Sequence, residues 1–85
     1  MRKIVFEPNA FTQYADWAVA DKDLFRKITK LVEEISRHPF EGSGKPEALK
    51  HKLKGYWSRR INQEHRIVYK VTDDSIIVFS CRFHY

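Results

Sequence analysis

The sequence is poor in cysteine and contains no long apolar run. Its single cysteine, Cys81, excludes an intramolecular disulfide, and no histidine pair has the spacing of a known metal site. No apolar run approaches the ~20 residues that span a membrane. The opening M-R-K-I-V-F-E-P has too few apolar residues before Glu7 for the core of a signal peptide. We therefore expect a cytoplasmic protein with no membrane segment, no metal and no cofactor.

The length and composition predict one folded domain. At 85 residues the chain is long enough for a single core, although it buries only about 60–65% of the surface exposed by the unfolded chain. Hydrophobic residues make up 42% of the sequence and aromatic residues 14%, which argues against disorder even though 32% of residues are charged. We expect one domain over residues 1–85.

The positive charge is concentrated in one segment. Residues 45–66 hold seven bases and two acids, a net charge of +5, while the rest of the chain has nine of each. The segment also contains Tyr56 and Trp57. A basic segment with interleaved aromatic residues is typical of polyanion binders. Charge alone does not decide between such a surface and a solvated basic face.

The first 20 residues predict a strand and a helix. K-I-V-F-E at residues 3–7 reads as a short strand, and Pro8 is suited to open a helix because the first helical N–H needs no partner. We predict this helix over residues 8–20. Its apolar stripe is predicted to comprise Phe11, Tyr14, Ala15 and Ala18.

The next segment predicts a second, strongly amphipathic helix. Its apolar residues recur at the spacing of one helical face, at Leu24, Ile28, Leu31, Val32 and Ile35. Asp21 is suited to cap its N-terminus. We expect the helix to end near His38, because Pro39 restricts its predecessor and cannot continue the ladder.

The second half of the sequence predicts a loop and three strands. F-E-G-S-G-K-P-E at residues 40–47 is irregular, and W-S-R-R-I, H-R-I-V-Y-K-V and S-I-I-V-F-S-C-R-F have the composition of strands. T-D-D-S separates the last two strands as a turn. The order βααβββ predicts an α+β fold, with two N-terminal helices packed on an antiparallel sheet.

Alternation predicts the register of the last two strands. One apolar face would hold Ile67, Tyr69 and Val71 from one strand, and Ile77, Phe79, Cys81 and Phe83 from the other. These sets share a face only if paired residue numbers sum to 148, which requires a three-residue loop or a bulge at the turn, since a plain two-residue Asp73-Asp74 turn would mismatch the faces. Arg66 then lies opposite Arg82 on the uncovered face, and Glu64 lies opposite His84.

Paired arginines beside a histidine predict chemistry on a phosphate. Arg66 and Arg82 would repel each other directly across the ladder, and an anion between them would relieve this repulsion. Phosphate suits guanidinium, which offers paired planar donors. Histidine exchanges protons near neutrality. These groups suit metal-free RNA cleavage, in which the 2′-hydroxyl attacks the adjacent phosphate.

That reaction also needs a proton acceptor. Glu47 lies among Lys45, Lys50 and His51, which keep a carboxylate ionised and close to a bound phosphodiester. Glu64 is the reserve candidate.

Four motifs together resemble a known family. G-K-P-E-A-L-K-H, G-Y-W-S-R-R-I-N-Q-E-H-R-I-V-Y, V-T-D-D-S and the terminal C-R-F-H-Y closely resemble the YoeB toxins of bacterial toxin-antitoxin pairs, within the RelE-like ribonuclease superfamily. The resemblance covers essentially the whole chain. It implies the RelE-like microbial RNase fold and a ribosome-dependent endoribonuclease that cuts mRNA in the A site. It also implies neutralisation by a YefM-like antitoxin, a homodimer, and contact with promoter DNA only through the toxin-antitoxin complex.

The resemblance also implies roles for individual residues. By position in the motifs, Glu47 is the general base, His84 the general acid and Arg66 the phosphate stabiliser, while Tyr85 orients the RNA or the acid. Lys50, Arg60 and Glu64 line the site, as Arg82 does in the strand register. Strict alternation instead sends Tyr85 to the apolar face.

Other functions are open alternatives. A non-catalytic protein could inhibit translation by occupying the ribosome or RNA. A DNA-binding module is disfavoured because the basic residues lie on a loop and strands, with no recognition helix. His51 and His65 read as surface or structural residues, and Cys81 as core. Tyr56 and Trp57 would stack on bases or pack a dimer.

Overall fold

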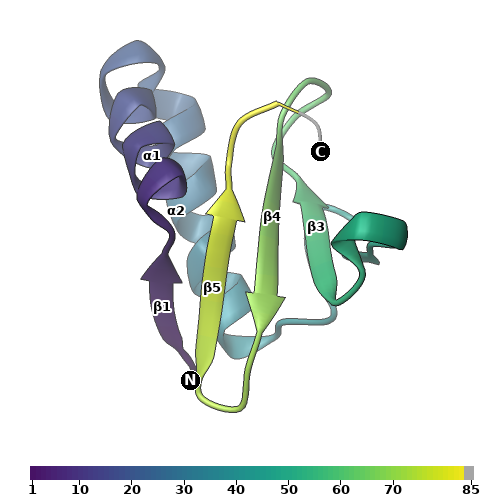
Figure 1. Ribbon diagram of the computed structural model, residues 1–85. Coiled ribbons are helices and arrows are strands. Elements are labelled where there is room, and N and C mark those ends of the chain that lie inside the picture. Colours follow the sequence, from purple (N-terminus) through teal and green to yellow (C-terminus); the bar gives the residue numbers. More distant parts are fainter. Residues whose placement is uncertain (84–85) are drawn as a thin grey trace.

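A computed structural model describes residues 1–83 and shows two helices packed on a five-stranded sheet (Figure 1). The elements follow in the order β1 (Lys3–Phe6), α1 (Pro8–Ala20), α2 (Lys22–Arg37), β2 (Glu47–Ala48), the 3-10 turn η1 (His51–Leu53), β3 (Tyr56–Arg60), β4 (Arg66–Val71) and β5 (Ser75–Ser80). Within this part of the chain, neither helix has the length and apolar content needed to cross a bilayer. The α+β class is confirmed.

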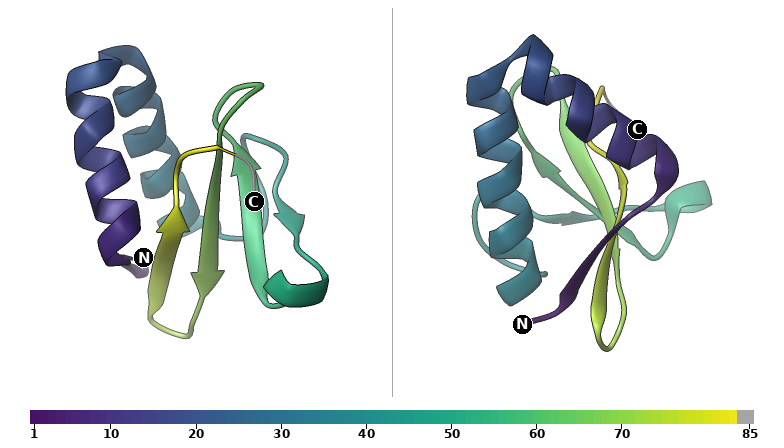
Figure 2. Two further views of the ribbon diagram at one scale, coloured as in Figure 1. Left: turned by 45° about the horizontal axis from the view of Figure 1, so that its top comes forward. Right: turned by 90° about the vertical axis from the view of Figure 1, so that its left-hand side faces the viewer.

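The sheet is mixed, whereas the sequence predicted an antiparallel one. Its strand order is β1-β5-β4-β3-β2, and β1 pairs parallel to β5 at one edge. The other neighbouring strands are antiparallel. Parallel neighbours need a long connection, which the two helices and the rest of the sheet supply. Both helices lie on the same side of the sheet (Figure 2), so its other side carries neither α1 nor α2.

Helix α2 forms as predicted. Its five apolar positions are buried, and the Asp21 carboxylate accepts a hydrogen bond from the Leu24 N–H at 3.1 Å. Arg37 is its last residue, directly before His38 and Pro39. The amphipathic stripe therefore determines both the helix and the face that it presents to the sheet.

Helix α1 has the predicted bounds but presents a different face. Ala10 is fully buried, and Tyr14 and Trp17 pack against the core. Phe11, which was expected in the buried stripe, is 61% exposed. The rotation of the helix is set by tertiary contacts, because the Trp17 indole N–H donates to the Cys81 carbonyl at 3.0 Å.

A bulge joins two registers in the β4–β5 pair. The turn has two residues, since Val71 pairs with Ile76 and the Thr72 N–H donates to the Ser75 carbonyl at 2.9 Å. Tyr69 pairs with Val78, but Val68 pairs with Ser80, which leaves Phe79 as the extra residue. The prediction of a three-residue loop or a bulge at the turn is therefore wrong, because the turn is a plain two-residue turn and the bulge lies at Phe79.

The place of the bulge corrects the predicted apolar face. Ile76 and Val78 join Ile67 and Tyr69 in the core, whereas Ile77 and Phe79 do not. An extra residue reverses the side-chain alternation beyond it, so Cys81 still enters the core as predicted. Burial raises the pKa of the Cys81 thiol to about 12, which keeps it protonated at neutral pH.

Candidate active site

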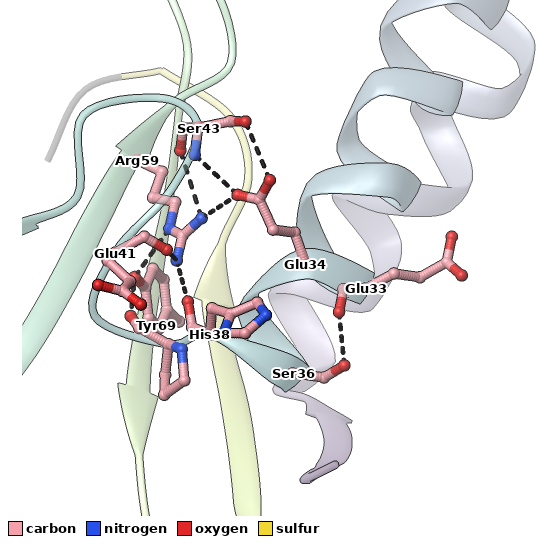
Figure 3. Close-up of polar contacts among 9 residues, drawn as sticks. Glu33, Glu34, Ser36, His38, Glu41, Ser43, Arg59 and Tyr69 are labelled. Atoms are coloured by element: carbon pink, nitrogen blue, oxygen red, sulfur yellow. Dashed lines mark hydrogen bonds and ion pairs between the residues drawn. The ribbon is translucent and has the colours of Figure 1, made fainter.

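The buried side chain of Arg59 organises the loop between α2 and β2 (Figure 3). Its guanidinium forms an ion pair with Glu34 and donates to the carbonyl oxygens of His38, Glu41 and Ser43. Its Nε donates to the Tyr69 hydroxyl at 3.2 Å. All five N–H groups of the guanidinium therefore have acceptors, and the loop that leads to Glu47 is tied to β3.

Glu34 and Tyr69 complete this network. Partial burial opposes the charged form of Glu34, but hydrogen bonds from Ser43 and the positive charge of Arg59 lower the pKa of its carboxyl below the ordinary value. Tyr69 donates its hydroxyl proton to the Pro39 carbonyl at 2.7 Å, and burial raises its pKa. The network thus holds the Arg59–Glu34 ion pair beneath the loop between α2 and β2.

Replacing Arg59 with methionine is expected to lower the free energy of unfolding by about 3 kcal/mol, because Glu34 and several loop carbonyls lose their partner. Urea denaturation measures the change. The matched control is Arg26→Met, which breaks an ion pair whose Arg26 and Asp23 side chains are 68% and 97% exposed. We expect the control to cost less than about 0.5 kcal/mol. Equal losses in the two variants would contradict the structural role of Arg59.

Glu34 predicts a pH dependence of stability. Because its pKa is lower in the folded protein than the ordinary value of 4.5, its contribution is complete above that value and is lost as the pH falls through the folded pKa. Below about pH 4.5, the unfolding free energy of the wild type should therefore fall more steeply than that of Glu34→Gln. Parallel curves for the two proteins in acid would refute this assignment.

The loop passes against β3 before it becomes β2. The Arg60 N–H donates to the Gly44 carbonyl at 2.7 Å. A Cβ on Gly44 would lie 2.7 Å from the Arg60 carbonyl oxygen, and the residue has a φ of +81°, so a side chain is excluded. This close approach brings the chain into β2, where Glu47 pairs with Ser58 of β3.

The face of the sheet opposite the helices, called the open face below, brings the candidate residues together. Paired residues of antiparallel strands share a face, and so do residues two apart on one strand. The pairs on this face are Glu47 with Ser58, Ser58 with Val68, and Arg60 with Arg66. The Arg66 guanidinium donates to the Ser58 hydroxyl at 3.4 Å. The register therefore assigns Glu47, Arg60 and Arg66 to the face on which Ser58 lies.

On the open face, strand β3 separates the strands that carry Glu47 and Arg66. Strands β2 and β4 are separated by β3 alone, so their backbones lie about 10 Å apart. The side chains of Glu47 and Arg66 project from the same face across this gap. The two arginines lie directly opposite each other, an arrangement that favours a bound anion. The sequence predicted such a pair, but with Arg82 as the partner of Arg66.

The predicted pairing of Arg66 with Arg82 is wrong. Strand β5 ends at Ser80, and the Arg66 N–H donates to the Phe83 carbonyl at 3.1 Å, because the chain has left the strand register. The Arg82 guanidinium carbon lies 5.7 Å from the centre of a Trp17 ring on α1 and 4.9 Å from the Phe83 ring centre. His84 and Tyr85 lie outside the described residues, so the predicted positions opposite Glu64 and on the apolar face stay predictions.

The remaining candidate residues lie on β3, on the turn after it and in the segment around η1. Lys50 and Glu47 line an open hollow of about 800 Å³ formed by residues 47–53. Glu64 lies in the exposed turn after β3, with Oε1 3.6 Å from His65 Nε2. Trp57 packs against the core and the Phe40 ring, and the Tyr56 ring lies 5.4 Å from that of Phe79. Trp57 is therefore partly structural.

Sequence reasoning missed two residues that build the site. Arg59 follows Trp57 by two positions and thus lies on the helix-covered side of β3. A charged residue on an apolar face needs buried partners, and this signal was available in the sequence. Ser58, which lies between Glu47 and Arg66, gave no such signal because strand β2 was not predicted.

Comparisons with known proteins identify the family of this chain. Residues 6–85 match the family described as the YoeB-like toxin of bacterial type II toxin-antitoxin systems. The chain belongs to this family. It is 49% identical to the toxin YoeB of Escherichia coli K12 over 83 residues, covering 98% of this chain and 99% of that protein.

Solved structures of YoeB toxins share the fold. The YoeB dimer of Staphylococcus aureus superposes with a TM-score of 0.91 at 48% identity, covering 99% of this YoeB-like toxin and 98% of that chain. A heterotetrameric YoeB-YefM complex from the same species has a TM-score of 0.90 at 48% identity, with coverage of 100% and 99%. The fold implied by the sequence resemblance is thereby confirmed. Within residues 1–83, no group of three potential metal-ligating side chains gathers.

Proposed function

We propose that this toxin is an endoribonuclease that cuts mRNA in the ribosomal A site, in the cytoplasm, without a metal ion. The observation that supports the proposal is the strand register, which assigns Glu47, Arg60 and Arg66 to one face of the sheet. A carboxylate and two guanidinium groups supply a proton acceptor and an anion-stabilising pair for one phosphodiester. Family membership supports the same reading.

In the proposed reaction the RNA supplies its own nucleophile. Glu47 accepts the proton of a 2′-hydroxyl, whose oxygen forms a bond to the adjacent phosphorus. Arg66, with Arg60 opposite it, stabilises the additional negative charge on the phosphoryl oxygens. His84 donates a proton to the departing 5′-oxygen as its bond to phosphorus breaks. The products are a 2′,3′-cyclic phosphate and a 5′-hydroxyl end.

The other candidate residues are assigned to RNA positioning. Tyr85 orients the RNA or the acid, Lys50 and Glu64 line the site, and Arg82 contacts the RNA backbone from its place over Trp17. The anchor of Phe83 beside Arg66 supports the role of the C-terminus, because His84 is bonded directly to Phe83.

The proposed partners follow from the family. We infer that a YefM-like antitoxin neutralises the toxin, since a related YoeB is found in a complex with YefM. A homodimer is proposed from the YoeB dimer of Staphylococcus aureus. Contact with promoter DNA is proposed only for the toxin-antitoxin complex.

Primer extension on translated mRNA tests the proposal with wild-type protein and His84→Gln. We expect new mRNA ends at the A-site codon with the wild type and a strong reduction with the variant, while both proteins bind ribosomes equally. Stalled ribosomes without new ends would instead indicate inhibition by occupancy. Undiminished cutting by the variant would refute His84 as the acid.

A further inference from the structure

Side chains from α1 and the β3–β4 turn hold the segment that follows β5. The Cys81 N–H donates to the Gln13 side-chain oxygen at 2.8 Å, and the Cys81 carbonyl accepts from the Trp17 indole at 3.0 Å. Two residues later, the Phe83 N–H donates to His65 Nδ1 at 2.7 Å. The Phe83 carbonyl accepts from the Arg66 N–H. Residues 81–83 are thus fixed on both sides.

His65 is itself held rigidly. Its side chain is almost completely buried, with its ring centre 4.8 Å from a Trp17 ring and 5.4 Å from the Phe83 ring. Its backbone N–H donates to the Asn62 side-chain oxygen at 2.7 Å, and its carbonyl accepts from the Ile61 N–H at 3.0 Å. The imidazole therefore presents Nδ1 to Phe83 in one fixed orientation.

The direction of this hydrogen bond defines the state of the imidazole. A backbone N–H can only donate, so His65 Nδ1 must offer its lone pair and the ring proton must lie on Nε2. The charged groups around the ring are Glu64, whose carboxylate lies 3.6 Å from Nε2, and the Arg82 guanidinium beside Trp17 and Phe83. His65 Nδ1 is thus the acceptor of this hydrogen bond.

Phe83 needs such support because of its backbone conformation. Its φ of 60° lies in the left-handed region, which side chains other than glycine adopt at an energetic cost. The hydrogen bonds to its N–H and carbonyl act on both sides of this residue and stabilise the conformation. These two hydrogen bonds fix the backbone of Phe83, to which residue 84 is bonded.

We propose that His65 is a positioning residue for the proposed catalytic C-terminus. By accepting the Phe83 N–H, it holds the residue to which His84 is bonded next to Arg66. The effect on cleavage rests on the proposed function, whereas the hydrogen bond can be measured without it.

Two variants separate the hydrogen bond from simple packing. His65→Asn places a side-chain oxygen near the position of Nδ1 but removes the ring, and His65→Phe keeps a ring against Trp17 but has no acceptor. We expect His65→Phe to lower the single-turnover cleavage rate at least roughly tenfold, while the ribosome affinity is unchanged. The reason is that a small displacement of a catalytic group from its reacting position lowers the rate strongly. His65→Asn should stay within about threefold of the wild type.

The opposite order, with His65→Phe active and His65→Asn inactive, would overturn the proposal in favour of packing. Equal activity of all three proteins would overturn it as well. Nuclear magnetic resonance supplies the independent readout, as a scalar coupling across the hydrogen bond between the Phe83 amide nitrogen and His65 Nδ1. If the wild type lacks this scalar coupling, the proposed hydrogen bond between Phe83 and His65 would be refuted. Wild-type protein that shows the coupling but leaves mRNA intact would refute the proposed nuclease function, and with it the effect of His65 on cleavage, while the contact itself stands.

Discussion

Replacing Glu47 with glutamine is expected to lower the single-turnover rate of mRNA cleavage on ribosomes by about 10³-fold, a typical loss for a general base. Glutamine preserves the size and shape of the side chain, but it replaces one carboxylate oxygen with an NH2 group and cannot accept the 2′-hydroxyl proton. Glu47 lies on strand β2 opposite Ser58, so the substitution leaves the backbone pairing intact. Ribosome affinity and melting temperature should therefore stay close to the wild-type values.

The control for this variant is Glu33→Gln, which makes the same charge change on the exposed surface of α2. We expect its rate to lie within about twofold of the wild type, as for most surface substitutions away from a site. Glu64→Gln tests the competing assignment. A large loss in Glu64→Gln together with an active Glu47→Gln would transfer the role of base to Glu64.

Replacing Arg66 with alanine is expected to lower the cleavage rate by about 10²–10³-fold, because a preorganised donor to the phosphoryl oxygens is lost. Arg66→Lys should recover only part of the rate, since an ammonium group lacks the paired planar donors of guanidinium. Single-turnover kinetics at saturating ribosome concentrations measures both variants.

The stability of the Arg66 variant should change much less than its activity. Arg66 lies directly opposite Arg60, so the substitution removes this like-charge pair together with the hydrogen bond to the Ser58 hydroxyl. We expect the free energy of unfolding to fall by no more than about 1 kcal/mol. Arg26→Ala, on the exposed surface of α2, serves as the matched loss of an arginine. If Arg66→Ala lost activity only through unfolding, the catalytic assignment would be contradicted.

The sequence predicted correctly the elements that depend on interactions between residues close together in the chain. The stripe and cap of α2 agree with the structure because one amphipathic face and one N-terminal acceptor suffice to define a helix. Alternation predicted an extra residue at the turn, but an extra residue anywhere between the turn and Cys81 restores the parity of Cys81, and the structure has it at Phe79. The position of the bulge depends on packing between segments that are distant in the sequence.

The parts that the sequence did not predict depend on contacts between distant segments. The parallel pairing of β1 with β5 and the short strand β2 have no periodic signal of their own. The face presented by α1 depends on Trp17 and its bond to Cys81. For the candidate site, motifs identified Glu47 and Arg66, whereas the role of Ser58 between them required the register of three strands.

The most direct test of the central claim is the chemistry of the mRNA ends produced by purified protein on translating ribosomes. Ends are labelled by polynucleotide kinase, with and without prior phosphatase treatment, and mapped to the codon in the A site. The account predicts ribosome-dependent fragments with a 5′-hydroxyl and a 2′,3′-cyclic phosphate. Intact mRNA on stalled ribosomes, or fragments with 5′-phosphate ends, would contradict it.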